Sequence, residues 1–136
     1  MKELIKSLAK EFDEAGIPFS FDAGTALFLQ GVEYDGMDDI DISVPWALLQ
    51  RVHQLLDGPT PIDDRGGWAK FRFEREGIPV DILSYKGTDL ATDPDRVALQ
   101  LGARTVYAKS LAFFQRNLPP DDPRRPAIAE RLANRH

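Results

Sequence analysis

The stretch that decides the fold is Asp39-Ile40-Asp41-Ile42-Ser43-Val44, in which polar and apolar residues alternate without interruption. Alternation with a period of two is typical of a β-strand with one buried face. The three apolar side chains then point into the core, while Asp39 and Asp41 point together from the opposite face. Two carboxylates held side by side are costly to keep ionised unless a cation lies between them.

A second strand of this kind is expected over residues 78–83, and it carries Asp81 between two apolar neighbours. Asp81 then faces away from the core, and it joins Asp39 and Asp41 if the two strands are adjacent. Carboxylate oxygens are ligands that Mg²⁺ prefers. Three carboxylates can hold two such ions about 3.5–4 Å apart, an arrangement that supports in-line displacement at phosphorus.

Gly24 and Thr25 stand where a short strand over residues 17–21 gives way to a helix over residues 24–30. A glycine at such a junction lets the backbone approach a phosphate closely, and the helix N-terminus offers free amide groups. Thr25 can add a hydroxyl donor. Both are therefore candidate phosphate ligands, although small residues also begin many helices that bind nothing.

The spacing of apolar residues predicts the elements around these motifs, and helices and strands are mixed along the chain. The further elements expected in this part are helices over residues 2–15 and 46–57, an acidic loop over residues 33–38, and a hairpin of strands over residues 68–73 and 78–83 that turns at Arg75-Glu76-Gly77. This order predicts one α/β (α+β) domain over residues 1–136, with a mixed β-sheet, flanking helices and a core at about 17–84.

Residues 105–136 are expected to form a C-terminal helical tail. Thr105 is expected to cap a helix that ends near Asn117, and a last helix should begin near Pro126 and bury Ile128. Four basic residues of the tail are expected to form a solvated helix face, with binding of phosphates or of an acidic partner as the alternative. These residues are Arg124, Arg125, Arg131 and Arg135.

Composition excludes several classes of function. The absence of cysteine excludes disulfide scaffolds, cysteine zinc sites and thiol catalysis. Residues 1–100 carry 10 Lys or Arg and 19 Asp or Glu, so the body is too acidic to coat duplex DNA. No apolar run approaches the ~20 residues that span a bilayer, and the N-terminus is unlike a signal peptide, so a cytoplasmic location and no membrane partner are expected.

In this order, Gly24-Thr25, then Asp39 and Asp41, then Asp81 resemble the motifs of the nucleotidyltransferase superfamily, whose members share the polymerase-beta-like fold. The resemblance covers residues 17–84, and it is closest to the small stand-alone branch with the minimal and lincosamide-type antibiotic nucleotidyltransferases. It implies transfer of an NMP group from an NTP to an acceptor hydroxyl with release of pyrophosphate. It also implies that Asp39 and Asp41 hold two Mg²⁺ ions, while Asp81 holds the catalytic ion and helps to deprotonate the acceptor.

The chain departs from the family pattern at two places. Ala23 stands at the first glycine position of the phosphate-binding turn, and residues 34–38 lack the Arg and Thr that many relatives carry before Asp-x-Asp. Another basic residue is therefore expected to contact the triphosphate. The candidates are Lys70, Arg72, Lys109 and Arg116.

Two other functions stay open. The chain could be a binding module on the same fold, such as the antitoxin of a toxin–antitoxin pair, with a helical toxin-like protein as its partner. Phosphodiester hydrolysis by the same carboxylates is less favoured, because no histidine lies near them in the sequence pattern. His53 is interpreted as a packing or surface residue. In the leading interpretation the acceptor is unidentified, and a second copy of the chain in a homodimer could help to hold it.

Overall fold

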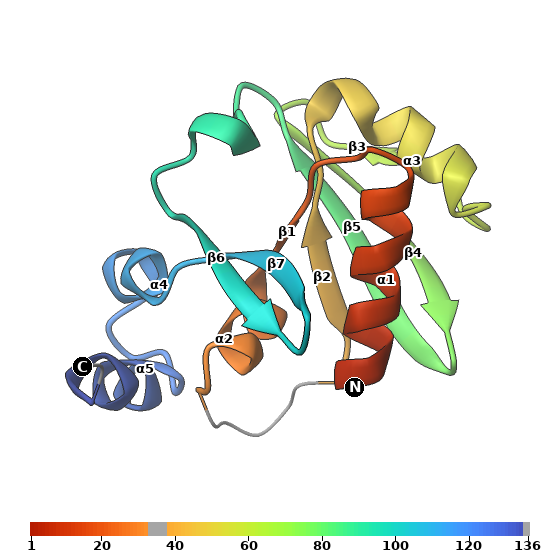
Figure 1. Ribbon diagram of the computed structural model, residues 1–136. Helices are drawn as coiled ribbons and strands as arrows, with labels where there is room; N and C mark the ends of the chain where they lie inside the picture. The colour runs from red at the N-terminus through yellow and green to blue at the C-terminus, as the bar shows by residue number, and fades with distance from the viewer. Residues whose placement is uncertain (33–37, 135–136) are drawn as a thin grey trace.

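A seven-stranded mixed sheet forms the centre of the protein (Figure 1). The computed structural model describes residues 1–32 and 38–134. The strands are β1 (Ser20–Phe21), β2 (Ile40–Ser43), β3 (Asp63–Asp64), β4 (Trp68–Arg75), β5 (Ile78–Tyr85), β6 (Arg96–Leu101) and β7 (Arg104–Lys109). Their order across the sheet is β3-β4-β5-β2-β1-β7-β6. The α/β class and the mixed sheet expected from the sequence are thus confirmed.

Helices and short 3₁₀ turns connect and cover these strands. Within the described ranges they are α1 (Lys2–Glu14), α2 (Ala23–Leu29), η1 (Trp46–Leu48), α3 (Leu49–Leu55), η2 (Leu90–Thr92), α4 (Leu111–Asn117) and α5 (Arg125–Ala133). The expected helix over residues 46–57 is therefore divided into η1 and α3. The expected acidic loop over residues 33–38 falls almost wholly on residues 33–37, which lie outside the described residues.

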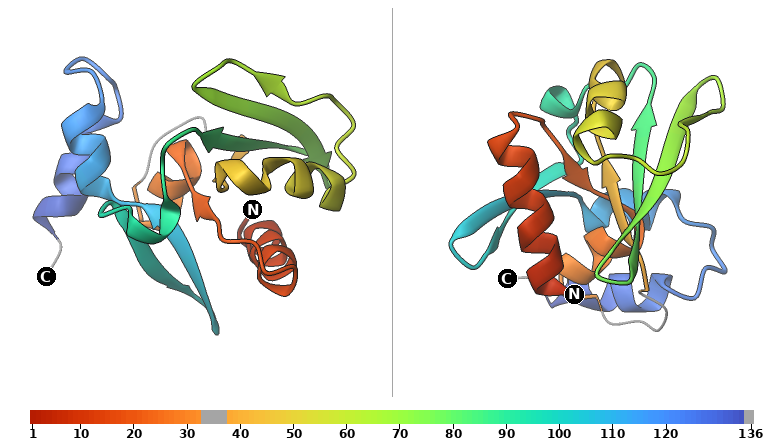
Figure 2. Two further views of the ribbon diagram at one scale, coloured as in Figure 1. Left: turned by 90° about the horizontal axis from the view of Figure 1, so that it is seen from above. Right: turned by 90° about the vertical axis from the view of Figure 1, so that its right-hand side faces the viewer.

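One face of the sheet carries the hydrophobic core. Helices α1 and α3 lie together on that face (Figure 2), and the apolar stripe of α1 is buried against it. Ile40 and Ile42 of β2 and Ile82 of β5 are completely buried there. Because successive side chains of a strand alternate between faces, the intervening residues of β2 and β5 emerge on the opposite face. Core packing of these strands therefore fixes where their carboxylates point.

Strand β2 lies between two strands that run in different directions relative to it. It pairs in parallel with β5, with Asp41 opposite Asp81, and antiparallel with β1, with Ser43 opposite Ser20. Strand β4 pairs antiparallel with β5 through the turn at Glu76-Gly77, where both residues have positive φ. The hairpin expected from the sequence is confirmed, and each of its strands extends two residues further.

The expected helix from Thr105 to Asn117 is wrong in its first half. Residues 96–109 form the hairpin β6–β7, which turns at Gly102 with a φ of +65° and adds two strands to the sheet. Val106 and Ala108 are buried at alternate positions, so this segment has the period of a strand. Helix α4 begins only after Ser110, whose hydroxyl accepts a hydrogen bond from the amide of Phe113.

The last helix agrees with the sequence in position and in its buried residue, Ile128. Its arginines, however, are not simply solvated. Arg125 donates to the carbonyls of Gln115 and Leu118, and Arg131 donates to the carbonyl of Gln30. Arg131 is exposed, as a solvated face requires, whereas Arg125 is partly buried, and both side chains fasten α5 to the rest of the protein. Arg135 lies outside the described residues.

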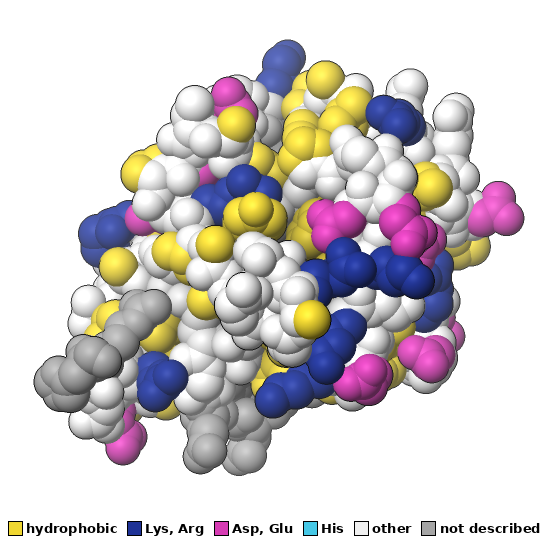
Figure 3. Space-filling view, in the orientation of Figure 1, with side chains coloured by type: hydrophobic (Ala, Val, Ile, Leu, Met, Phe, Trp, Pro, Cys, Tyr) yellow, Lys and Arg dark blue, Asp and Glu magenta, His cyan; other side chains and the backbone are white. Residues whose placement is uncertain are grey.

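The surface over α1 mixes charges of both signs. On this side of the molecule, basic side chains lie next to acidic ones (Figure 3). The ion pairs there join Lys6 to Glu3, Lys10 to Glu14 and Arg104 to Asp13. Such pairing leaves little of the unopposed positive charge that binding to a nucleic-acid backbone needs. No helix of residues 1–32 and 38–134 is long and apolar enough to cross a membrane.

Candidate active site

Three carboxylates meet on the sheet face opposite α1. Asp39 directly precedes β2, Asp41 lies on β2, and Asp81 lies on β5 as the register partner of Asp41. One oxygen from each side chain lies within 4.8 Å of the others. The adjacency of the two strands, which the sequence left as a condition, is therefore met, and the separation is small enough for a shared cation.

Arg72 of β4 lies directly across from Asp81 and binds it at both oxygens. Its Nε donates to Oδ1 at 2.7 Å and its Nη2 donates to Oδ2 at 2.8 Å. The same Nη2 lies 3.6 Å from Oδ2 of Asp39. One guanidinium therefore bridges two of the three carboxylates, and the pairing raises the pKa of Arg72 above its already high ordinary value.

The electrostatics of the site favour an added positive charge. Burial, followed by the charges of Asp39 and Asp81, raises the pKa of Asp41 from 3.8 to about 7. Burial and the charge of Asp81 also raise the pKa of Asp39. Arg72 opposes both shifts without cancelling either. A cation between the carboxylates would remove this repulsion.

The junction of β1 and α2 lies beside the carboxylates. Thr25 is completely buried, and its Oγ1 accepts a hydrogen bond from the backbone amide of Asp41 at 2.9 Å. Gly24 occupies the first turn of α2. Ala23 begins the helix with a φ of +46°, a left-handed conformation that favours glycine. The alanine in place of the family glycine is therefore strained.

The expected triphosphate-binding cations are spread over the site and its edge. Lys70 and Arg72 project from β4 on the face that carries Asp81, and the Lys70 ammonium lies 5.9 Å from the ring centre of Trp68. Lys109 forms an ion pair with Asp93, and Arg116 forms one with Asp95. Of the four candidates, only Arg72 contacts the carboxylate cluster.

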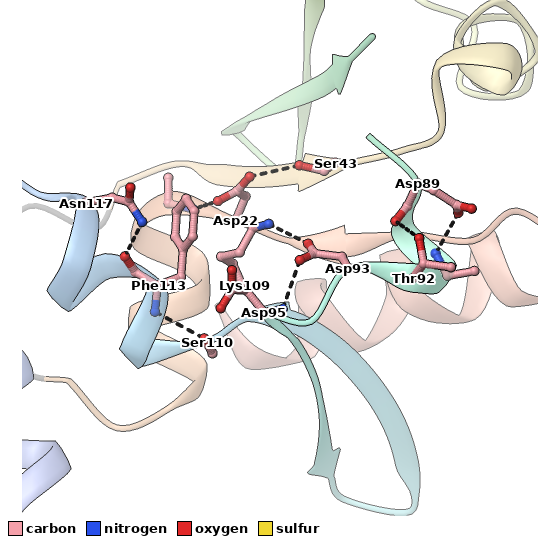
Figure 4. A network of polar contacts seen from close by, with 12 residues as sticks. Asp22, Ser43, Asp89, Thr92, Asp93, Asp95, Lys109, Ser110, Phe113 and Asn117 are labelled. Atoms are coloured by element: carbon pink, nitrogen blue, oxygen red, sulfur yellow. Dashed lines mark hydrogen bonds and ion pairs between the residues drawn. The ribbon is translucent and has the colours of Figure 1, made fainter. Parts of the chain in front are cut away.

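A cavity of about 320 Å³ adjoins the carboxylates on the same sheet face. Figure 4 shows part of its wall, where Asp22 meets Ser43 and Lys109 points to Asp93. The Oγ atom of Ser20, buried in this wall, has no hydrogen-bond partner among the described residues. The lining residues are Ser20, Asp22, Ser43, Tyr85, Thr88, Leu90, Asp93, Lys109 and Phe113. The cavity thus offers aromatic and apolar surface with a few polar groups, as ligand sites usually do.

Sequence reasoning missed Asp22 and its surroundings. The Asp22 carboxylate accepts hydrogen bonds from the amide of Ala23 and the hydroxyl of Ser43. Burial, and after it the charge of Asp22, raises the pKa of Tyr85 above its ordinary value. A signal was present, since an aspartate directly before a helix is a common cap. His53 was interpreted correctly as a packing residue, because its ring lies edge-on to Phe71 and Nε2 is hydrogen-bonded to the carbonyl of Thr60.

The carboxylate cluster fits a hard divalent cation by the chemistry of its donors. All three ligand groups supply oxygen, and Asp39 and Asp41 are destabilised by one another when ionised. The fit is that of an open site with three protein ligands, which leaves coordination positions for water or for substrate oxygens. Mg²⁺ commonly binds through a few carboxylates together with substrate phosphates.

Comparison with known proteins identifies the fold. No family model matches the chain, and neither does any curated protein sequence. Several solved structures are similar to it across nearly its whole length. The lincosamide antibiotic adenylyltransferase LnuA, bound to lincomycin, has a TM-score of 0.71 at 17% identity, covering 98% of this chain and 96% of its own.

The second structure is ANT(2″)-Ia in complex with adenylyl-2″-tobramycin. It has a TM-score of 0.63 at 16% identity, and the match covers 96% of this chain and 88% of the other. A solution structure of ANT(2″)-Ia gives a TM-score of 0.62 at 17% identity. At these identities the likeness concerns the fold alone, and the protein therefore has the fold seen in LnuA and in ANT(2″)-Ia.

Proposed function

We propose that the protein is a divalent-metal-dependent nucleotidyltransferase that moves an NMP group from an NTP to an acceptor hydroxyl. The observation that carries the proposal is the meeting of Asp39, Asp41 and Asp81 within 4.8 Å on the open face of this fold. One similar structure is that of a lincosamide antibiotic adenylyltransferase bound to lincomycin, and another holds adenylyl-2″-tobramycin, which supports the same class of reaction here.

In this reaction the acceptor oxygen forms a bond to the α-phosphorus. The bond from that phosphorus to the bridging oxygen breaks, and pyrophosphate leaves with the electron pair. Asp39 and Asp41 would hold both Mg²⁺ ions, and Asp81 would hold one. When bound, Mg²⁺ supplies neutralisation of phosphate charge and a lowered pKa of the acceptor hydroxyl. Asp81, on the strand next to β4, is proposed to help take up the hydroxyl proton.

The rest of the substrate-binding surface surrounds this centre. Gly24 at the start of α2 is proposed to approach the phosphates, while the buried Thr25 acts by fixing α2 to β2. Lys70 reaches the same sheet face and is proposed to contact phosphate. Lys109, paired with Asp93 in the cavity wall, is proposed to orient a polar group of the substrate there.

Thermal unfolding with each NTP at millimolar concentration, with and without Mg²⁺, tests the proposal. A ligand at about 100 times its Kd stabilises a protein by about 2.7 kcal/mol, which raises Tm by several degrees in a domain of this size. We expect a rise that requires Mg²⁺ and is absent from the Asp39→Asn/Asp41→Asn variant. Asp57→Asn, which changes an exposed aspartate outside the site, should keep the rise.

Turnover then requires an acceptor. Mass spectrometry of hydroxylated amines such as lincomycin and tobramycin, incubated with protein, NTP and Mg²⁺, should detect a product heavier by one NMP group. No Tm shift with any NTP would contradict nucleotidyl transfer. It would favour the binding-module alternative, which the strained Ala23 at the phosphate-binding turn also supports.

A further inference from the structure

The Arg72 guanidinium binds the two oxygens of Asp81 that a metal ion would need as ligands. Both oxygens of Asp81 accept from Arg72, at 2.7 and 2.8 Å, and the guanidinium extends to within 3.6 Å of Asp39. Among the residues that the structure describes, only Arg72 forms ion pairs with members of the cluster, and these are Asp39 and Asp81. Without a metal ion, the cluster therefore already has a positive charge of its own.

This internal cation and a divalent ion compete for the same place. A bidentate guanidinium uses the oxygen lone pairs that face it, and its charge repels a second cation only a few ångströms away. The competition is strongest at Asp81, which Arg72 holds directly, and weakest at Asp41. A divalent ion therefore binds between Asp41 and Asp81 with lower affinity than it would if Arg72 were absent.

Arg72 is also accessible from solvent. Its side chain is 57% exposed, and its side-chain hydrogen bonds and ion pairs with described residues are made to Asp81 and Asp39. A guanidinium released from a carboxylate binds phosphate oxygens equally well, since both present a pair of oxygens to its two donors. A polyphosphate arriving at the face would therefore offer Arg72 a new partner at the moment a metal ion takes its old one.

We propose that Arg72 is a positioning residue that holds Asp81 in place until metal and polyphosphate arrive together, and then transfers its guanidinium to a phosphate. The inference rests on the proposed function. It explains how the site discriminates against a metal ion without nucleotide. The expected signature is a strong coupling: nucleotide increases metal affinity, and part of that increase depends on Arg72.

The test measures Mn²⁺ binding, by calorimetry and by the electron paramagnetic resonance of free Mn²⁺, with and without a non-hydrolysable NTP. Removing a full charge near a divalent ion at the surface is expected to tighten Mn²⁺ binding about tenfold in Arg72→Gln without nucleotide. The gain that nucleotide adds should shrink by a similar factor. Arg72→Lys, which keeps the charge but cannot bind both oxygens, should fall in between.

Arg65→Gln is the matched control, since it removes one guanidinium whose ion pair is with Asp63, outside the cluster. Its Mn²⁺ affinity should change less than twofold. Unchanged or weaker Mn²⁺ binding by Arg72→Gln would overturn the inference, as would an equal effect of Arg65→Gln. Failure of the wild-type protein to bind Mn²⁺ and nucleotide at all would instead overturn the proposed function.

Discussion

The Asp41 carboxylate carries most of the electrostatic cost of the site. Its pKa of about 7 in the folded protein lies above the ordinary value of 3.8, mainly because of burial. The folded state therefore binds a proton that the unfolded chain has released between about pH 4 and pH 7. The free energy of unfolding falls as the pH rises through that window, because the ionised carboxylate is unfavourable in its buried position beside other carboxylates.

We expect Asp41→Asn to stabilise the metal-free protein. The gain in the free energy of unfolding should be about 1–2 kcal/mol at pH 8, a value reduced from the full pKa shift because the side chain is partly exposed. The gain should shrink as the pH falls towards 4. Urea unfolding in the presence of a chelator at pH 4.5 and pH 8 checks this. A gain that does not change with pH would show that charge is not its cause.

Ala23 is a second residue with an energetic cost, because its backbone conformation is unfavourable for alanine. Its φ of +46° costs an L-residue about 1–2 kcal/mol relative to glycine, whereas glycine adds about 0.4–1 kcal/mol of entropy to the unfolded chain. We expect Ala23→Gly to leave stability unchanged or raise it by about 1 kcal/mol. Ala129→Gly, on an exposed position inside α5, should instead destabilise by about 1 kcal/mol. Urea unfolding of both variants measures the contrast, and equal losses would contradict it.

At the scale of elements, a hydrogen bond joins α2 to β2. The amide of Asp41 donates to Oγ1 of the buried Thr25 at 2.9 Å. The bond holds the start of α2 close to the carboxylates. Together with the hydrogen bond from Ser43 to Asp22, the N-cap of α2, it joins the helix that would approach phosphate to the strand that would hold metal.

Thr25→Val should destabilise the protein by about 1–3 kcal/mol, because the isosteric side chain leaves a buried amide without an acceptor. Thr25→Ser keeps the hydroxyl and should lose less. Chemical denaturation of both variants measures the difference. Equal losses from the two would mean that the methyl group, rather than the hydrogen bond, matters.

Elements with a consistent periodicity were predictable from the sequence. The Asp-x-Asp strand alternates strictly, and Asp81 stands between two apolar neighbours on its own strand. The buried faces of these strands, and hence the directions of their carboxylates, therefore follow from the pattern. The helix expected over residues 105–117 was wrong in its first half. Tyr107, Leu111 and Phe114 have helical spacing, although Val106 and Ala108 alternate as in a strand. The pairing of Arg72 with Asp81 could not be predicted, because it depends on the register of β4 against β5.

At the scale of the whole molecule, the C-terminal helices belong to the same core as the sheet. Figure 1 shows α4 and α5 side by side at the end of the molecule away from β4, yet Ile128 is completely buried and continuous with the main hydrophobic cluster. Arg131 adds a hydrogen bond to the carbonyl of Gln30, at the end of α2. The helices therefore support the element that carries Gly24 and Thr25.

We expect Ile128→Ala to lower the free energy of unfolding by about 2–4 kcal/mol, as truncation of a fully buried side chain usually does. Because the core is continuous, circular dichroism and tryptophan fluorescence should report the same single transition. Leu55→Ala, at an exposed apolar position, should cost much less. Separate transitions for the helical signal and the fluorescence would contradict a shared core.

The parallel pairing of β2 with β5 also has a kinetic consequence. Asp41 and Asp81 become neighbours only when strands separated by α3, β3 and β4 come together, a contact between distant parts of the chain. Local hairpins such as β4–β5 form in microseconds, whereas pairing at long sequence separation is slow. The carboxylate cluster therefore forms only once this pairing is complete. A metal ion added during refolding would report the completion of this pairing, and it would select fully assembled chains over partly folded ones.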